Sequence, residues 1–177
     1  MTGESRSAAP SVRYRTDRDL DDCVGVLAEV HDRDGYPVNW PDRPAEWLAQ
    51  PSLTGAWVAE LAGRIVGHVG LSRSVAGDVA PGLWSVRAGV SADRAAVVSR
   101  LFVAPSARGH GIGALLMARA VRAARERHLH PVLDVVASDT AAAALYERLG
   151  WRLLATVERE WSPDQRVTVR CYAAAPS

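Results

Sequence analysis

Three glycines stand at alternate positions, Gly109, Gly111 and Gly113, between a β-branched stretch and an apolar pattern of helical spacing. The first N–H groups of a helix have no intrahelical partner and, together with the helix dipole, they favour an anion. Glycine removes the Cβ atoms that would hold a diphosphate away from these groups. Arg108 adds a positive charge directly before the first glycine. The segment therefore predicts a pyrophosphate-binding turn.

Two other phosphate-binding motifs fit this segment less well. A Walker P-loop needs Lys and then Ser or Thr after its last glycine, whereas Ala114 follows Gly113 here. A dinucleotide-binding fingerprint needs glycine in place of Ala114, and an acidic residue at a strand end about 20 residues further on. Asp134 stands in the middle of a predicted strand, and the strands before the glycines are joined by a hairpin. We therefore exclude the P-loop and disfavour the dinucleotide-binding fold.

A second motif, DTAAAALYERLGW, lies downstream of the glycines. Together with LFVAPSARGHGIGALLM it resembles the paired motifs of the GNAT N-acetyltransferase superfamily, R/Q-x-x-G-x-G/A and N-x-x-A-x-x-x-Y-x-x-x-G-F. The resemblance extends roughly over residues 12–173 and is most specific over residues 99–151. It departs from the family pattern at Asp139, which takes the place of Asn. The motif positions in this chain are Arg108, Gly111, Gly113, Asp139, Ala142, Tyr146, Gly150 and Trp151.

The resemblance implies an α/β (α+β) fold with a mixed, mostly antiparallel central sheet and helices on both faces. It also implies acetyl-CoA as the co-substrate and no metal. In this family the strand before the turn is splayed from its neighbour and binds the pantetheine arm through its backbone, while the turn holds the pyrophosphate. The cofactor-binding positions carried over by the resemblance are Leu101, Phe102, Val103, Arg108, Gly109, His110, Gly111, Ile112, Gly113, Ala114, Asp139, Ala142 and Tyr146.

Tyr146 matches the general acid of the family, a phenol that donates a proton to the leaving sulfur. An alkylammonium must lose a proton before it can attack, so the reaction also needs a base. Many relatives place a glutamate early in the strand before the turn, where this chain has Val97. The base therefore stays open among Glu60, His68, Asp34 and an ordered water chain.

The loop that follows the first predicted helix carries the side chains that we expect to face the acceptor, Asp34, Tyr36 and Trp40. A carboxylate attracts a cationic amine, and the aromatic rings of Tyr36, Trp40 and Trp47 offer an apolar or cation–π wall. We expect acetyl transfer to the primary amine of a small molecule, by direct attack in a ternary complex. A protein N-terminus or lysine is an alternative acceptor. A catalytically silent module that binds or senses acyl-CoA is an alternative function.

The predicted elements place these residues around one sheet, in the order β-α-(α)-β-β-β-α-β-α-β-β. Ile112 begins the apolar face of the helix after the glycines, and Asp139 caps the next helix, which Gly150 ends. We expect one domain over residues 12–173, a disordered tail over residues 1–11, and a partial loop within residues 73–94. The predicted strands are 12–15, 56–61, 65–72, 95–103, 132–136, 151–158 and 166–173, and the predicted helices are 20–30, a turn at 44–49, a helix from 112 and 139–149.

The chain carries almost no net charge. Its 177 residues include 21 Lys and Arg and 20 Asp and Glu, for a formal net charge of +1, which gives no reason to expect a nucleic-acid or membrane partner. No apolar run reaches the roughly 18 residues of a membrane span. Cys23 and Cys171 lack metal-ligand spacing and are expected to be buried as small apolar residues. These features favour a cytoplasmic monomer or homodimer.

Overall fold

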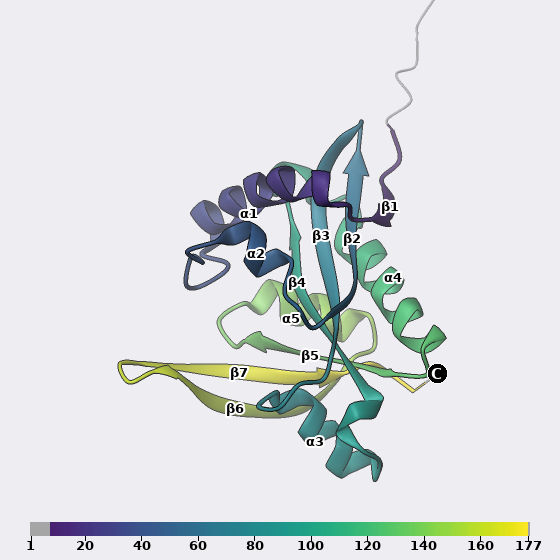
Figure 1. Ribbon diagram of the computed structural model, residues 1–177, viewed down its shortest axis with the longest axis vertical. Coiled ribbons are helices and arrows are strands. Elements are labelled where there is room, and N and C mark those ends of the chain that lie inside the picture. Colours follow the sequence, from purple (N-terminus) through teal and green to yellow (C-terminus); the bar gives the residue numbers. More distant parts are fainter. Residues whose placement is uncertain (1–7, 177) are drawn as a thin grey trace, which may run out of the picture.

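A seven-stranded sheet forms the centre of the computed structural model, which describes residues 8–176 (Figure 1). Its strands are β1 (Ser11–Tyr14), β2 (Leu53–Leu61), β3 (Arg64–Arg73), β4 (Ala95–Val103), β5 (His130–Val136), β6 (Arg152–Ser162) and β7 (Gln165–Ala173). They lie in the order β1-β2-β3-β4-β5-β7-β6, and neighbours are antiparallel except β4 and β5, which are parallel. The mixed, mostly antiparallel sheet that the sequence predicts is confirmed.

Helices cover both faces of this sheet, as predicted. They are α1 (Leu20–Asp34), α2 (Pro44–Leu48), α3 (Val79–Ala88), α4 (Ile112–Glu126) and α5 (Thr140–Arg148). Figure 1 shows α1 and α2 in front of the sheet and α4 and α5 behind it. Short 3₁₀ turns precede α1, β4 and α4, at Asp17–Asp19, Ala92–Arg94 and Pro105–Ala107.

The parallel pair β4 and β5 stays together over only a short distance. Hydrogen-bonded pairing runs from Ala95 with His130 to Val97 with Val132, and then the two strands separate. Figure 1 shows β4 and β5 leaving a common end in different directions. Along the rest of β4, the edge that faces β5 has no strand beside it, so its backbone groups must find partners elsewhere.

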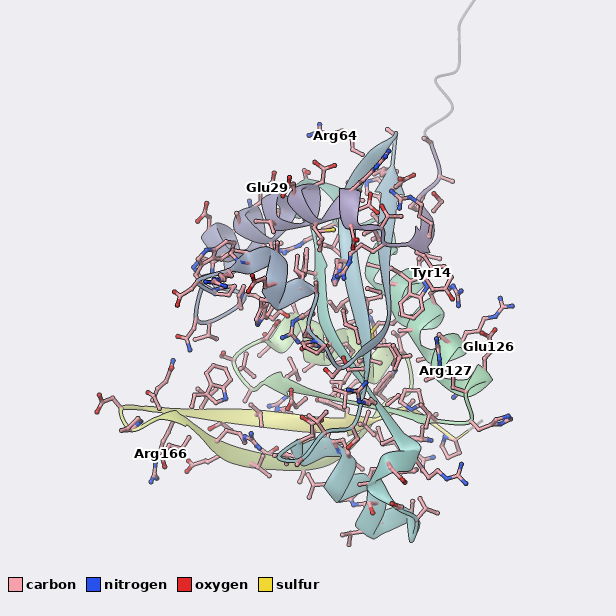
Figure 2. The ribbon with its side chains drawn as sticks, in the orientation of Figure 1. Tyr14, Glu29, Arg64, Glu126, Arg127 and Arg166 are labelled. Atoms are coloured by element: carbon pink, nitrogen blue, oxygen red, sulfur yellow. The ribbon has the colours of Figure 1, made fainter. Side chains whose placement is uncertain are left out.

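Helix α4 begins where the sequence predicts, directly after the glycine turn. Most of the residues that repeat at helical spacing are buried, although Leu115 is exposed. Arg122 and Arg125 are exposed on the opposite side, whereas Arg119 is partly buried over the rings of Tyr14 and Trp57. The helix packs against β2, β3 and β4 and closes the main core. Figure 2 shows Glu126 and Arg127 at its outer, C-terminal end. The buried face of α4 consists of Ile112, Leu116, Met117, Ala120, Ala123 and Ala124.

Helix α3 lies within the segment that was expected to be partly a loop. Pro81 and Gly82 weaken the helical pattern of this segment in the sequence, because both residues usually interrupt helices. Pro81 stands in the first turn, where its missing N–H would have no acceptor in any case. Ala80 and Pro81 are buried, and α3 covers a second, smaller core formed with β4, β5, β6 and β7.

The first strand and the last hairpin of the fold extend beyond the boundaries predicted for them. Residues 1–7 of the expected tail lie outside the described residues, and β1 already begins at Ser11. The β6–β7 hairpin is longer than predicted, with Arg166 at its far end (Figure 2). Cys23 and Cys171 are buried free thiols, as expected. Within the described residues, no helix has the length and apolarity needed to cross a membrane.

Candidate active site

A cleft of about 700 Å³ opens at the N-terminus of α4, and we call it the α4 cleft. Its walls come from the end of β4, the glycine turn, the start of α5 and the segment after α1. Two of the predicted cofactor residues do not line it: His110 is exposed outside the cleft, and Tyr146 lies deeper. The predicted residues that do line it are Leu101, Phe102, Val103, Arg108, Gly109, Gly111, Ile112, Gly113, Ala114, Asp139 and Ala142.

Glycine is needed at the three positions of the turn for two different physical reasons. Gly109 and Gly111 adopt φ values of 85° and 71°, in the left-handed region that other residues rarely occupy. Gly113 is helical, and a Cβ added there would lie 3.1 Å from the side chain of Leu145 on α5. The first two glycines therefore shape the turn, and the third lets α4 approach α5.

The N-terminus of α4 presents unpaired donors to the cleft. The first bond of the helix runs from the N–H of Leu115 to the carbonyl of Gly111 at 3.1 Å. The N–H groups before Leu115 have no intrahelical acceptor, and they stand at the positive end of the helix dipole. The open edge of β4 reaches the same cleft through Leu101 and Val103. These groups fit a pyrophosphate joined to an extended, amide-bearing arm.

Cations stand at the mouth of the α4 cleft. Arg108 forms an ion pair with Asp34, the last residue of α1, and its guanidinium also lies 3.4 Å from the carbonyl of Val103. Arg148, at the end of α5, lines the cleft from the other side. No motif in the sequence marks Arg148, because its place at the cleft depends on how α5 docks against α4.

A second cavity, of about 420 Å³, adjoins the α4 cleft, and we call it the Asp134 cavity. It shares Leu101, Val136 and Ala142 with the cleft, so the two spaces meet where β4 and β5 have separated. Its remaining walls include aromatic rings, two arginines and one carboxylate in mid-strand. The residues that line this cavity and not the α4 cleft are Pro37, Asn39, Trp47, Val98, Ser99, Arg100, Asp134, Val135, Tyr146, Arg159, Trp161 and Val169.

Tyr146 lines the Asp134 cavity from α5. Its side chain is 6% exposed, and its ring packs against Trp151 at 6.1 Å and Tyr172 at 6.0 Å between centroids. Burial raises the pKa of Tyr146 above its ordinary value of 10, and the nearby phenol of Tyr36 raises it further. The hydroxyl is therefore protonated at neutral pH and can act as a donor.

Asp134 lies on β5, two residues beyond Val132, the last β5 residue that is paired with β4. Its side chain is open to the cavity, and its backbone is paired with Cys171 of β7. The surrounding protein raises the pKa of this carboxyl by desolvation, against an opposing effect from the charge of Arg159. In the sequence, Asp134 stands out only as a poor match to a dinucleotide-binding site. Its role depends on the register between strands far apart in the chain.

The residues named from the sequence as alternative bases lie away from the Asp134 cavity. Glu60 lies near the C-terminal end of β2 and forms an ion pair with Arg13. Asp34 lines the α4 cleft and is paired with Arg108. His68 is fully buried, so none of the three reaches the space that Tyr146 lines.

Both ring nitrogens of His68 have partners. Nδ1 lies 2.9 Å from the carbonyl of Arg100, and Nε2 lies 2.9 Å from a guanidinium nitrogen of Arg15. A neutral ring with the proton on Nδ1 satisfies both contacts, because Nδ1 then donates and Nε2 accepts. Burial lowers the pKa of His68 to about 4, and its ring stacks on Phe102. These contacts make His68 a structural histidine of the core.

The expected acceptor residues separate in the structure. Tyr36 lines both cavities, whereas Asp34 lines only the α4 cleft. Trp40 lines neither cavity, and its ring packs against His31 at 5.2 Å. Trp47, which the sequence also suggested as part of the aromatic wall, lines the Asp134 cavity, and so does Trp161, which was not assigned to the acceptor site.

The comparisons with known proteins agree with this geometry. Residues 21–151 match the model of the acetyltransferase (GNAT) family. Three of the solved structures that share the fold illustrate this. The ribosomal-protein-S18-alanine N-acetyltransferase of Escherichia coli is 18% identical, with 93% of this chain and 92% of that chain covered and a TM-score of 0.66. The ribosomal-protein-alanine N-acetyltransferase of Brucella melitensis is 22% identical, with 92% and 98% covered and a TM-score of 0.66.

The third structure is yncA from Salmonella typhimurium with its cofactor acetyl-CoA. It is 18% identical, with 96% of this chain and 99% of that chain covered and a TM-score of 0.68. None of the curated proteins compared with this chain matches it.

The fold has a parallel strand pair that separates at an open helix N-terminus, with a second cavity behind the gap, and the family that it matches supports an acetyl-CoA-dependent acyltransferase. The family match extends over most of the chain. The chain belongs to the acetyltransferase (GNAT) family, and the resemblance seen in the two sequence motifs is confirmed.

Proposed function

We propose that the protein transfers an acetyl group from acetyl-CoA to the primary amine of a small molecule, by direct attack in a ternary complex. The observation that carries the proposal is the junction of the two cavities at the β4–β5 gap, with Tyr146 and Asp134 beside it. A thioester placed in the gap would be reached from both sides. The cofactor would lie in the α4 cleft and the acceptor in the Asp134 cavity.

The α4 cleft supplies the groups that coenzyme A needs. The free N–H groups before Leu115 and the left-handed turn at Gly111 would hold the pyrophosphate. Arg108 and Arg148 would add positive charge for the phosphates. The open edge of β4, at Leu101 and Val103, would bind the amides of the pantetheine arm as a neighbouring strand does.

Asp134 is the group that we assign as the base. An ammonium acceptor must be deprotonated before its nitrogen can form a bond to carbon. Desolvation raises the pKa of Asp134, which makes this carboxylate a better proton acceptor than an ordinary aspartate. It would take the proton directly or through one water.

Tyr146 is the group that we assign as the general acid. Acetyl-CoA supplies a thioester with an acyl carbon open to attack and a sulfur that leaves as the acyl group moves. The protonated phenol of Tyr146 would donate its proton to that sulfur. The pKa values of Asp134 and Tyr146 are thus suited to opposite tasks, one accepting a proton and the other donating one.

The dimensions of the Asp134 cavity favour a small molecule. A volume of about 420 Å³ is within the range of small-ligand pockets, and aromatic rings from α2, β6 and the loop after α1 surround it. A protein N-terminus or lysine remains the alternative acceptor. A module that only binds acyl-CoA would have no need for a base and an acid facing the same gap.

A thiol-release assay with acetyl-CoA and a panel of amines tests the proposal. The panel contains amino acids, polyamines, aminoglycosides and short peptides with free N-termini. The control is Gly111→Glu, because its carboxylate and its Cβ would occupy the turn that holds the phosphates. We expect release of coenzyme A with a small amine, and none with the variant. A melting temperature raised by acetyl-CoA without transfer to any amine would contradict the enzyme and favour the binding module.

A further inference from the structure

Arg100 projects from an irregular position of β4 into the Asp134 cavity. Its backbone has a φ of 52°, which is rare for a residue other than glycine. The pairing of β3 and β4 shifts register at this point, and the carbonyl of Arg100 bonds to Nδ1 of His68. The fold thus holds Arg100 in a strained conformation that turns its side chain toward the cavity.

The guanidinium of Arg100 lacks the partners that such a group usually has. It lies over the ring of Trp47, with its central carbon 4.1 Å from the ring centroid. Its Nε is buried without a hydrogen-bond partner, and the neighbouring Oγ of Ser99 is in the same state. Within residues 8–176 the side chain forms no ion pair with a carboxylate. A half-buried cation without an anion is costly unless a ligand supplies one.

Apart from Asp134, the other charged groups of the cavity have partners in the protein. The carboxylate of Asp139 caps α5 through the N–H of Ala142 at 3.1 Å. Arg159 donates to the carbonyl of Gly77 at 3.2 Å and lies close enough to Asp134 to lower its pKa. Within residues 8–176, the guanidinium of Arg100 has neither a hydrogen-bond acceptor nor a carboxylate partner.

Arg100 and Asp134 line the same cavity from the two strands that border the gap. Arg100 is three residues beyond Val97 on β4, and Asp134 is two residues beyond Val132 on β5, where Val97 and Val132 are the last pair. One side of the gap therefore offers a cation and the other a carboxylate. An acceptor that spans them needs an amine toward Asp134 and an anion toward Arg100.

We propose that Arg100 binds a carboxylate of the acceptor, so that the acceptor is a free α-amino acid and not a peptide or a simple amine. This inference rests on the proposed function and narrows its substrate class. The planar guanidinium suits a carboxylate, and its stacking on Trp47 leaves its edge free to donate. Trp47 and Trp161 line the same cavity and favour an apolar side chain on the amino acid.

The test compares matched pairs of acceptors in the wild-type protein and in Arg100→Met. Leucine, methionine and phenylalanine are each offered as the free acid and as the carboxamide. In each protein, the kcat/KM for the acid is divided by the kcat/KM for the amide. The ratio for the wild-type protein is then divided by the ratio for Arg100→Met. Differences in amine basicity cancel in this quotient. We expect the ratio to fall at least about ten-fold in Arg100→Met, equivalent to about 1.4 kcal/mol. Arg100→Lys should retain part of the preference.

A binding measurement separates this inference from the proposed function. In the presence of coenzyme A, the free acids should raise the melting temperature of the wild-type protein more than the amides, and Arg100→Met should lose that difference. Transfer to amines with the same acid-to-amide ratio in both proteins would overturn the role of Arg100 and leave the enzyme in place. Binding that depends on Arg100 without any transfer would support the carboxylate site and overturn the proposed enzyme.

Discussion

Arg108, at the mouth of the α4 cleft, forms an ion pair with Asp34, the last residue of α1. The sequence predicts a phosphate-binding role for the first and an acceptor role for the second. The structure joins them instead at one cleft, on the side where the phosphates of coenzyme A would lie. If Arg108 binds those phosphates as proposed, Asp34 would compete with them for the same guanidinium.

Asp34→Asn should lower the KM for acetyl-CoA by about two- to five-fold. The size is modest because both side chains are substantially exposed, and exposed pairs contribute about 0–1 kcal/mol. Initial rates at varied acetyl-CoA measure it. In an Arg108→Met background, Asp34→Asn should have no effect. A higher KM in the single variant would mean that Asp34 positions Arg108 for binding and does not compete for it.

Gly111→Ala and Gly63→Ala form a matched pair. Both glycines have positive φ, 71° and 77°, and an added Cβ would meet no atom within 4 Å at either site. Both variants should therefore lose about 1–2 kcal/mol of unfolding free energy through backbone strain. Only Gly111→Ala should weaken acetyl-CoA binding, because Gly63 lies in the β2–β3 turn. Urea unfolding and calorimetric titration measure the two quantities. Equal affinities for acetyl-CoA in both variants would contradict the assignment of the turn.

The buried His68 should make the fold sensitive to mild acid. Its pKa is lowered from 6.5 to about 4 in the folded protein, so the unfolded chain binds the proton first. Stability should therefore be unaffected above pH 6.5 and should fall as the pH drops from 6.5 toward 4, by on the order of 3 kcal/mol. Urea unfolding at several pH values measures the slope. His68→Gln should flatten it, whereas the exposed His110→Gln should retain it.

Asp134→Asn should lower kcat at neutral pH by about 10²–10⁴-fold, the usual contribution of a positioned base. The kcat of the variant should rise with pH, because the bound amine then loses its proton without help. In the wild type, the acidic limb of kcat should lie above the ordinary carboxyl pKa of 3.8, since burial raises the pKa of Asp134. A pH profile of both proteins at saturating substrates measures this. A variant with wild-type kcat throughout would remove Asp134 from the reaction.

The parts of the fold that rest on local signals could be predicted from the sequence. The glycine turn, the apolar face that begins at Ile112 and the cap formed by Asp139 all depend on neighbours a few residues away. Helix α3 was missed because Pro81 and Gly82 weaken the local pattern, and its stability comes from packing against distant strands. The periodicity of a short segment does not report which distant strands the segment will pack against.

The acceptor side of the site could not be predicted in the same way. Asp134 and Arg100 meet one cavity because of the register of β4 against β5 and the shift in pairing between β3 and β4. Neither feature has a signature in the residues around them. Trp47 and Trp40 are equally aromatic in the sequence, but only Trp47 lines the Asp134 cavity, because α2 places it over Arg100.

The kcat of Tyr146→Phe, compared with that of Tyr172→Phe, tests the central claim most directly. The two rings pack together in the core, and the Tyr172 hydroxyl bonds to Glu147 at 3.0 Å instead of facing the cavity. We predict that Tyr146→Phe lowers kcat by about 10²–10⁴-fold with little change in melting temperature, while Tyr172→Phe leaves kcat within about three-fold. Equal kcat values in Tyr146→Phe and the wild type would contradict a general acid at this position and the account of the site built around it.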